Sequence, residues 1–206
     1  YREEGFLDAQ VVSDSIWYSD DKRGMFIHIT VDEGARSYIR NIVWKGNTVY
    51  PDSVLSSRLG FERGDVFNET RFEENLKGNK DQTDVASLYL DTGYLRFFAQ
   101  DERLRVAADS VDVVITVMEN NKSRIGHVVI RGNTKTQDKV IRRGLYTWPG
   151  DYFSRSAIIR SIRELATLNY FNPETIRPEP QMVNDSLVDI IYNVEERSSD
   201  TFNASV

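Results

Sequence analysis

The chain contains an internal repeat whose two copies lie 86 residues apart. The letters KGNT at 45–48 correspond to RGNT at 131–134, and GDVF at 64–67 corresponds to GDYF at 150–153. Apolar residues between these matches recur at the same spacing, as Val54, Leu55 and Leu59 and then as Val140, Ile141 and Leu145. Agreement at several separate places indicates a duplicated module, so the chain is predicted to fold as small repeated units.

The local pattern of each copy predicts a strand, a turn and a short helix. Ile125, Val128 and Ile130 are spaced as in a half-buried strand. Gly132 and the asparagine after it tolerate left-handed backbone angles, which stop a strand. An amphipathic segment follows and ends at the helix-breaking letters PGD, 149–151. In the first copy Trp44 takes the position of Ile130, so it is expected in the core.

A second set of matches closes each module. The letters YREEGF at 1–6 resemble YLDTGY at 89–94, which we interpret as a glycine-capped helix end that leads into a strand. The strand after this cap is predicted at 6–16, at 95–105 and, in the last module, at 174–178. The final strand is predicted at 25–31, 110–117 and 188–194.

These patterns predict an α+β fold of tandem β-α-α-β-β modules, each a three-stranded mixed sheet with two helices packed on one face. Residues 1–35 would be the last two strands of one module, 36–121 a complete module and 122–198 a second complete module. The span from Phe67 to Gly93 is 26 residues, but the equivalent span from Phe153 to Asn169 is 16. We expect the additional residues, around 78–84, to be a surface loop that interrupts the second helix of the middle module.

Composition excludes several classes of protein. The 206 residues carry a formal net charge of −6 and include no cysteine. An acidic chain lacks the basic surface that phosphate binding requires, so no nucleic-acid partner is expected. Disulfides and thiol chemistry are excluded, and no apolar run approaches the roughly 20 residues of a membrane helix. Because residues 1–5 look like the middle of a module, we expect the chain to be a fragment.

The sequence shows no signature of catalysis. His28 and His127 lie in predicted strands without further His or Cys at metal-ligand spacing. The letters GFERGD at 60–65 lack the Lys and Ser/Thr of a phosphate-binding loop. No grouping of Ser, His and Asp recurs between the copies. We therefore predict a binding protein with no catalytic residue, no metal and no cofactor.

The modules resemble POTRA domains over nearly the whole chain. The resemblance lies in the β-α-α-β-β order, the GNT turn, and the stretches LYLDTGYL at 88–95, IRRGL at 141–145 and LNYFNPETIRPEP at 168–180. It is closest to the membrane-proximal part of the periplasmic arm of outer-membrane protein assembly factors. The end of the chain is similar to the junction at which the last POTRA domain enters a barrel. Residues 199–206 are therefore expected to start the first barrel strand.

This resemblance implies a scaffold and receptor in the outer-membrane β-barrel assembly machine, on the periplasmic side of the bacterial outer membrane. The implied partners are unfolded outer-membrane proteins, accessory lipoproteins of the complex and the outer membrane itself, reached through a barrel after this chain.

Other classes of protein use related modules. A two-partner secretion or translocation-type transporter has the same fold; secretion transporters typically have two POTRA domains and the related cell-division protein has one, whereas this chain shows parts of three. A nucleic-acid-binding KH domain shares the βααβ order but has a Gly-x-x-Gly loop between its helices, which this chain lacks.

The resemblance also implies where an extended client would bind. In POTRA domains the strand after the second helix is an edge strand, and an open edge can accept an added strand through backbone hydrogen bonds. The predicted peptide-binding residues of the middle module are Leu95, Arg96, Phe97, Phe98, Ala99, Gln100, Asp101 and Arg103. In the last module, Pro173, Pro178 and Pro180 flank the predicted strand and remove donors, so that edge is expected to be closed to pairing.

The last module carries three candidates for docking a partner. Arg142 and Arg143 follow the apolar pair of the predicted helix, where they are either an ordinary solvated face or a contact for an acidic partner. Trp148 precedes Pro149 and either caps the packing of the helix or presents a partner surface.

Overall fold

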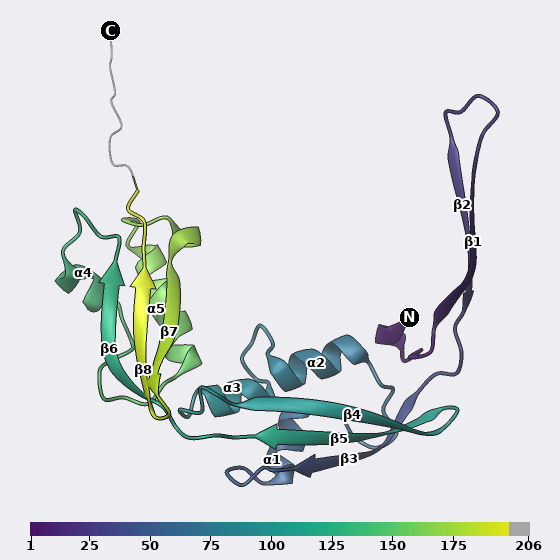
Figure 1. Ribbon diagram of the computed structural model, residues 1–206, viewed down its shortest axis with the longest axis horizontal. Helices are drawn as coiled ribbons and strands as arrows, with labels where there is room; N and C mark the ends of the chain where they lie inside the picture. Colours follow the sequence, from purple (N-terminus) through teal and green to yellow (C-terminus); the bar gives the residue numbers. More distant parts are fainter. Residues whose placement is uncertain (198–206) are drawn as a thin grey trace. The chain divides into compact units, whose positions relative to one another are not determined.

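The computed structural model describes residues 1–197 (Figure 1). Its contacts divide this part of the chain into two compact units. The first unit contains residues 1–85 and 98–118, and the second contains residues 86–97 and 119 onward. The expected start of a barrel strand at 199–206 lies outside the described residues.

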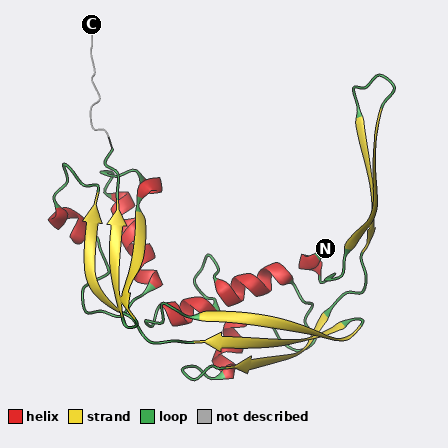
Figure 2. Cartoon of the chain, in the orientation of Figure 1, coloured by secondary structure: helices red, strands yellow, loops and turns green. Residues whose placement is uncertain are grey.

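The first unit contains a hairpin and most of one module (Figure 2). Its elements are η1 (Arg2–Glu4), β1 (Gln10–Tyr18), β2 (Met25–Asp32), β3 (Tyr38–Lys45), α1 (Asp52–Leu59), α2 (Glu69–Lys77), β4 (Phe98–Ala107) and β5 (Ser110–Met118). β1 and β2 pair only with each other among the described residues, and β3, β5 and β4 form a sheet in that order. In this sheet β3 runs parallel to β5 and β4 runs antiparallel to it.

The second unit repeats the module. Its elements are most of α3 (Val85–Leu90), then β6 (Arg124–Arg131), α4 (Asp138–Arg142), α5 (Arg155–Thr167), η2 (Pro173–Thr175), β7 (Arg177–Asn184) and β8 (Leu187–Asn193). The sheet order is β6-β8-β7, again with a parallel and an antiparallel pair. Figure 1 shows α5 behind this sheet. The predicted fold class, tandem modules with three-stranded mixed sheets, is confirmed.

The core of each module lies between its sheet and its helices. The central strand supplies alternating buried residues, Val111, Val113, Ile115 and Val117 in β5. Trp44 is 6% exposed, as expected for a core residue, and its Nε1 donates to Ser56 Oγ at 2.9 Å. Alternation along β3 and β6 is interrupted by a bulge, between Ile39 and Asn41 and between Ile125 and Val128. The bulge explains why buried positions are three residues apart there.

The predicted starts of three strands were wrong. β1 begins at Gln10, β4 at Phe98 and β7 at Arg177, later than the predicted positions 6, 95 and 174. A tight turn follows each glycine cap, with Leu7 N donating to Gly5 O and Leu95 N to Gly93 O. In the last module Asn172 caps the short helix η2, which occupies the predicted strand start. Local turn hydrogen bonds therefore delay strand pairing by several residues.

The two turn glycines occupy equivalent and crowded positions. Gly46 has φ +82° and Gly132 has φ +92°, angles that residues with a Cβ rarely adopt. A Cβ on Gly46 would collide with the carbonyl oxygen of Val117, and a Cβ on Gly132 with that of Val194. Both turns thus rest on the backbone at the end of the central strand, which sets where the first helix begins.

A hydrogen-bond relay also recurs in the two units. A glycine carbonyl accepts from a serine N–H at 2.8 Å, and the carbonyl of that serine accepts from a phenylalanine N–H at 2.9 Å. The serines are fully buried. The relays are Gly5–Ser37–Phe67 and Gly93–Ser123–Phe153. Each relay ties the segment before a module to the first strand of that module and to the loop before its second helix.

Replacing Gly132 with alanine tests the close approach of the turn to the central strand. We expect a loss of about 3 kcal/mol in the free energy of unfolding, because left-handed strain of about 1 kcal/mol adds to an overpacking cost of about 2 kcal/mol. Urea denaturation of the whole chain, followed by circular dichroism, measures this.

Gly150→Ala is the matched control, since Gly150 has φ +93° but no atom lies within 4 Å of the place that a Cβ would take. This variant carries the strain alone and should lose about 1 kcal/mol. Equal losses in the two variants would contradict the proposed collision with Val194.

Candidate strand-edge interface

β4 is an edge strand of the middle module. It pairs with β5 on one side, and no strand among residues 1–197 pairs with its other side. Ala99, Asp101 and Arg103 lie on one face of β4, opposite the buried residues Val117, Ile115 and Val113 of β5. Phe98, which is 55% exposed, and Gln100 lie on the opposite, solvent-facing side of the sheet.

The predicted binding residues divide into two groups. Phe98, Ala99, Gln100, Asp101 and Arg103 lie in β4. The placement of Leu95, Arg96 and Phe97 on the edge strand was wrong, because these residues form the turn that precedes it and belong to the second unit.

These three turn residues have partners of their own in the second unit. Phe97 stacks on Tyr89 with ring centroids 4.2 Å apart. Arg96 donates to a carboxylate oxygen of Asp185 at 3.0 Å, and Leu95 packs against the core of the second module. Their role is therefore to hold the turn.

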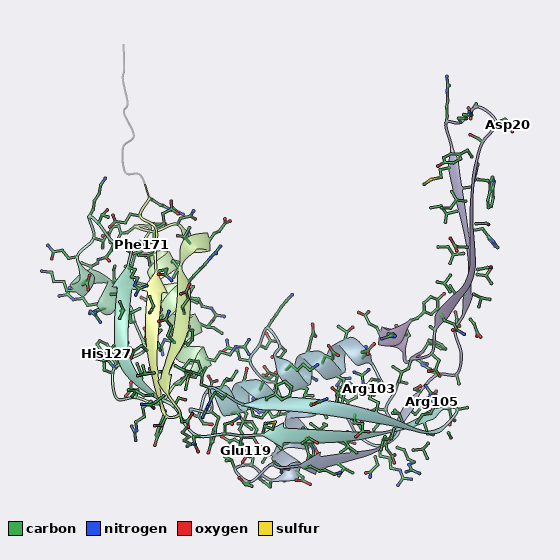
Figure 3. All side chains as sticks on the ribbon, in the orientation of Figure 1. Asp20, Arg103, Arg105, Glu119, His127 and Phe171 are labelled. Atoms are coloured by element: carbon green, nitrogen blue, oxygen red, sulfur yellow. The ribbon has the colours of Figure 1, made fainter. Side chains whose placement is uncertain are left out.

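Arg103 is fixed in a network with helix α2 (Figure 3). Its guanidinium pairs with Glu69, donates from Nε to Asp101 at 2.9 Å and lies 4.9 Å above the ring of Phe67. Burial alone would raise the pKa of the Glu69 carboxyl, but Arg103 and Arg2 lower it below its ordinary value. The side chain of Arg103 is thus occupied within the module, and the backbone of β4 is what remains at the edge.

The proline positions in β7 show which backbone groups face outward. Pro178 and Pro180 lie within β7, opposite Tyr192 and Ile190, so the prediction that they flank the strand was wrong; Pro173 lies in η2. Proline within a sheet is confined to positions whose nitrogen faces away from the neighbouring strand. The outer edge of β7 therefore lacks two hydrogen-bond donors.

Aligning the two modules shows which residues of β4 are equivalent to the prolines of β7. Trp44 pairs with Ile115 in the first unit, and Ile130, which is equivalent to Trp44, pairs with Tyr192 in the second. Ile115 therefore corresponds to Tyr192, and their partners Asp101 and Pro178 correspond in turn. By the same step Arg103 corresponds to Pro180. The N–H groups of Asp101 and Arg103 are thus the outward-facing donors of β4.

The predicted docking residues of the last module surround α4. Arg142 is the last residue of α4, and its Nη1 donates to the carbonyl oxygen of Val128 at 3.1 Å. Arg143 follows as the helix cap. Trp148 is 52% exposed and lies in the loop after the helix. Arg142 therefore has a structural partner on β6, whereas Trp148 presents a large apolar surface.

Glu196 holds the turn that leads into α4. Its carboxylate accepts from Thr134 Oγ1 at 2.6 Å and from Lys135 N at 2.9 Å, and also from the N–H of Thr136. The hydrogen bond from Thr134 and those from the backbone lower the pKa of Glu196 to about 2. The sequence gives no local signal for this contact, because Glu196 and the GNT turn are about sixty residues apart.

Among residues 1–197 no group of three or more His, Cys, Asp or Glu side chains could hold a metal ion. None of the helices in this range has the length and apolar character needed to cross a membrane.

Comparison with known families gives two matches in this chain. The family described as "POTRA: Surface antigen variable number repeat" matches residues 37–120 and 123–197. These ranges contain β3 to β5 and β6 to β8 respectively.

Curated relatives are outer-membrane assembly factors. A putative outer membrane protein assembly factor of Treponema pallidum is 31% identical over 204 residues, which is 97% of this chain and 24% of that protein. Outer membrane protein assembly factor BamA of Neisseria meningitidis is 27% identical over 186 residues, 82% of this chain and 22% of that protein. The chain thus spans about a quarter of the length of these relatives.

Solved structures show the same fold. The structure of Haemophilus influenzae BamA POTRA3-5 matches with a TM-score of 0.75 at 19% identity, covering 95% of this chain and 76% of that one. BamA from Haemophilus ducreyi lacking POTRA domains 1-3 matches with a TM-score of 0.58 at 23% identity, covering 80% of this chain and 29% of that one.

The low pKa of Glu196 gives the second unit a pH dependence. Because the folded-state pKa, about 2, lies below the ordinary value of 4.5, the carboxylate stabilises the fold above pH 4.5 and this stabilisation is lost as the pH falls toward 2. We expect Glu196→Gln to lose less stability than the wild type between pH 4.5 and pH 2. Urea denaturation at stepped pH measures this, with Glu195→Gln as the charge-matched control. If both variants kept the wild-type pH slope, the carboxylate would have no such role.

Proposed function

Because this chain belongs to the POTRA family, we propose that it is a periplasmic part of an outer-membrane protein assembly factor and that it binds unfolded outer-membrane proteins as added β-strands. We place it on the periplasmic side of the bacterial outer membrane, because its relatives are named as outer membrane protein assembly factors. The function is binding, without catalysis and without a cofactor. The barrel that would connect it to the membrane is expected after this chain.

The observation that carries the binding proposal is the open edge of β4. Among residues 1–197, β4 (Phe98–Ala107) pairs with β5 alone, and its register leaves the N–H groups of Asp101 and Arg103 facing outward. A nascent barrel protein presents extended segments of alternating polarity. Such a segment can join the edge through backbone hydrogen bonds, which require no particular side chains. A receptor for many different clients needs this lack of side-chain specificity.

The face of β4 away from the helices favours the same client. Phe98 is 55% exposed and Leu104 44%, and both lie on this outer face, opposite Met118 and Asp112 of β5. An added strand would place its own apolar residues beside them as cross-strand neighbours. This supports a client segment with apolar residues at every second position.

The last module is proposed to dock accessory subunits rather than clients. Pro178 and Pro180 remove the donors of its edge strand, so strand addition there is disfavoured. Trp148 offers an exposed aromatic ring and Arg143 an exposed cation, residue types that are enriched at protein interfaces. Within this site Arg142 acts mainly through its bond to Val128.

Proline at position 101 tests pairing at β4. Asp101→Pro removes an outward N–H without disturbing the ladder to β5, whereas Asp101→Ala removes the same carboxylate and keeps the N–H. We expect Asp101→Pro to weaken client binding about fivefold relative to Asp101→Ala, because one backbone hydrogen bond contributes about 1 kcal/mol. The measurement is photo-crosslinking from position 100 to a urea-diluted outer-membrane porin, at a series of porin concentrations.

A second variant tests the opposite change, the restoration of backbone donors to β7. Replacing Pro178 and Pro180 together with threonine restores two donors to β7 and should create porin cross-links from position 179. Equal cross-linking by Asp101→Pro and Asp101→Ala, with both variants shown to be folded by circular dichroism, would refute binding at β4.

A further inference from the structure

The first unit contains a groove on the opposite border of the sheet, beside β3. It has a volume of ≈ 490 Å³ and is lined by Arg40–Ile42 of β3, Ser56 of α1 and residues 61–63 of the following loop. An adjoining hollow of ≈ 540 Å³ shares Ser56 and Phe61 and continues along Ser53 and Ser57 of α1. The groove therefore runs between a strand edge and a helix face made of short side chains.

Half of the β3 edge is already sealed by the protein itself. Gly64 N donates to Ile39 O at 2.7 Å, Ile39 N donates to Asp65 O at 2.8 Å, and Phe67 N donates to the carbonyl of the residue before Tyr38 at 2.9 Å. The bridge between Tyr38 and Val66 is antiparallel. This internal strand stops at Ile39, so the groove begins where the pairing of β3 ends.

The second unit shows where the next carbonyl of β3 points. Val128 of β6 corresponds to Ile42, since each follows the bulge and lies at the 86-residue offset. The carbonyl of Val128 faces away from β8, because it accepts from Nη1 of Arg142. The carbonyl of Ile42 therefore faces the groove, and no donor among residues 1–197 reaches it from that side.

One helix position decides whether this edge is closed. The residue equivalent to Arg142 is Ser56, whose hydroxyl accepts from the indole of Trp44 and is too short to reach Ile42. The same replacement of a basic residue by serine occurs at three positions of this helix. Ser53, Ser56 and Ser57 of the first module correspond to Lys139, Arg142 and Arg143 of the second.

We propose that the groove beside β3 binds an extended polypeptide segment as an additional strand, antiparallel to residues 42–45. This segment would continue the line of the internal strand 64–67, and its N–H groups would donate to the carbonyls of Ile42 and Trp44. Four residues at about 3.3 Å each would fill the free part of β3.

The lining also defines the chemistry of the segment. Ile42 is half-buried and Phe61 is 3% exposed, so residues that face the floor of the groove are apolar or small. Glu62 and Arg63 line the groove with opposite charges, and the charge of Arg40, which also lines it, is paired with Asp112. Outward residues of the segment are therefore polar and carry no net charge. The ligand is thus a strand of alternating polarity, and this site is separate from the β4 edge of the proposed function.

Two variants, Ser56→Arg and Arg142→Ser, test this site. The probe is a capped peptide of four Val-Thr repeats with a lysine at one end and a glutamate at the other, titrated into the isotope-labelled chain while amide chemical shifts are recorded. In the wild type, shifts are expected at Ile42, Trp44 and Phe61. Ser56→Arg should weaken the β3-edge binding at least tenfold, because the guanidinium would occupy the Ile42 carbonyl. Arg142→Ser should produce new shifts at Val128 and Ile130.

Ser56→Ala controls for the lost bond to Trp44, because it removes the hydroxyl without filling the groove and should bind the peptide as the wild type does. Asp101→Pro should leave these shifts unchanged, which separates this site from the β4 edge. Unaltered peptide binding by Ser56→Arg, shifts limited to β4, or shifts at Ile42 that depend on protein concentration without peptide would overturn the proposal.

Discussion

The contact between a turn glycine and the end of the central strand governs the layout of both modules. Gly46 and Gly132 bring the turn against the carbonyls of Val117 and Val194, closer than any residue with a Cβ could come. This contact fixes where the first helix starts, and the helix then covers the sheet from a set distance. The loop after that helix returns to the first strand and seals half of its outer border. The groove beside β3 begins where this seal ends.

The fold could be predicted because the repeat spacing can be recognised without knowing where each strand begins or ends. Matches of glycine, asparagine and apolar residues at one offset identified the module and its order of elements, and Trp44 was recognised as core. Strand starts could not be predicted, because turns such as Gly93–Leu95 hold their backbone by short-range hydrogen bonds that leave no periodic signal.

The candidate site was predictable only in part. β4 carries five of the eight predicted residues, but the engagement of Arg103 with Glu69 depends on a contact across the fold. The significance of Ser56 was hidden for a different reason: it is visible only when the two copies are compared at the level of a hydrogen bond, Arg142 to Val128. A comparison of the copies residue by residue along α1 and α4 would have found the exchange of serines for basic residues.

The two modules have the same framework but differ in how their sheet borders are finished. In the second, prolines remove donors from β7 and an arginine occupies an acceptor of β6. In the first, the corresponding positions are Asp101, Arg103 and Ser56, which leave the backbone free. On the two binding proposals, a few substitutions on a shared scaffold would open the sheet borders of one copy to extended chains and close those of the other. This difference is consistent with selection against strand addition in one copy.

The compact units do not coincide with the sequence repeats. Residues 86–97 lie within the middle repeat in sequence, yet their contacts place them with the second unit, where Asp91 accepts from the N–H of Ser156 at the start of α5. The relay of Gly93, Ser123 and Phe153 also ties this segment to the second unit. Consequently, cooperative opening should cross the repeat boundary: amide protons of residues 86–97 would exchange with deuterium together with those of α5. The second unit thus depends for its stability on a segment of the preceding repeat.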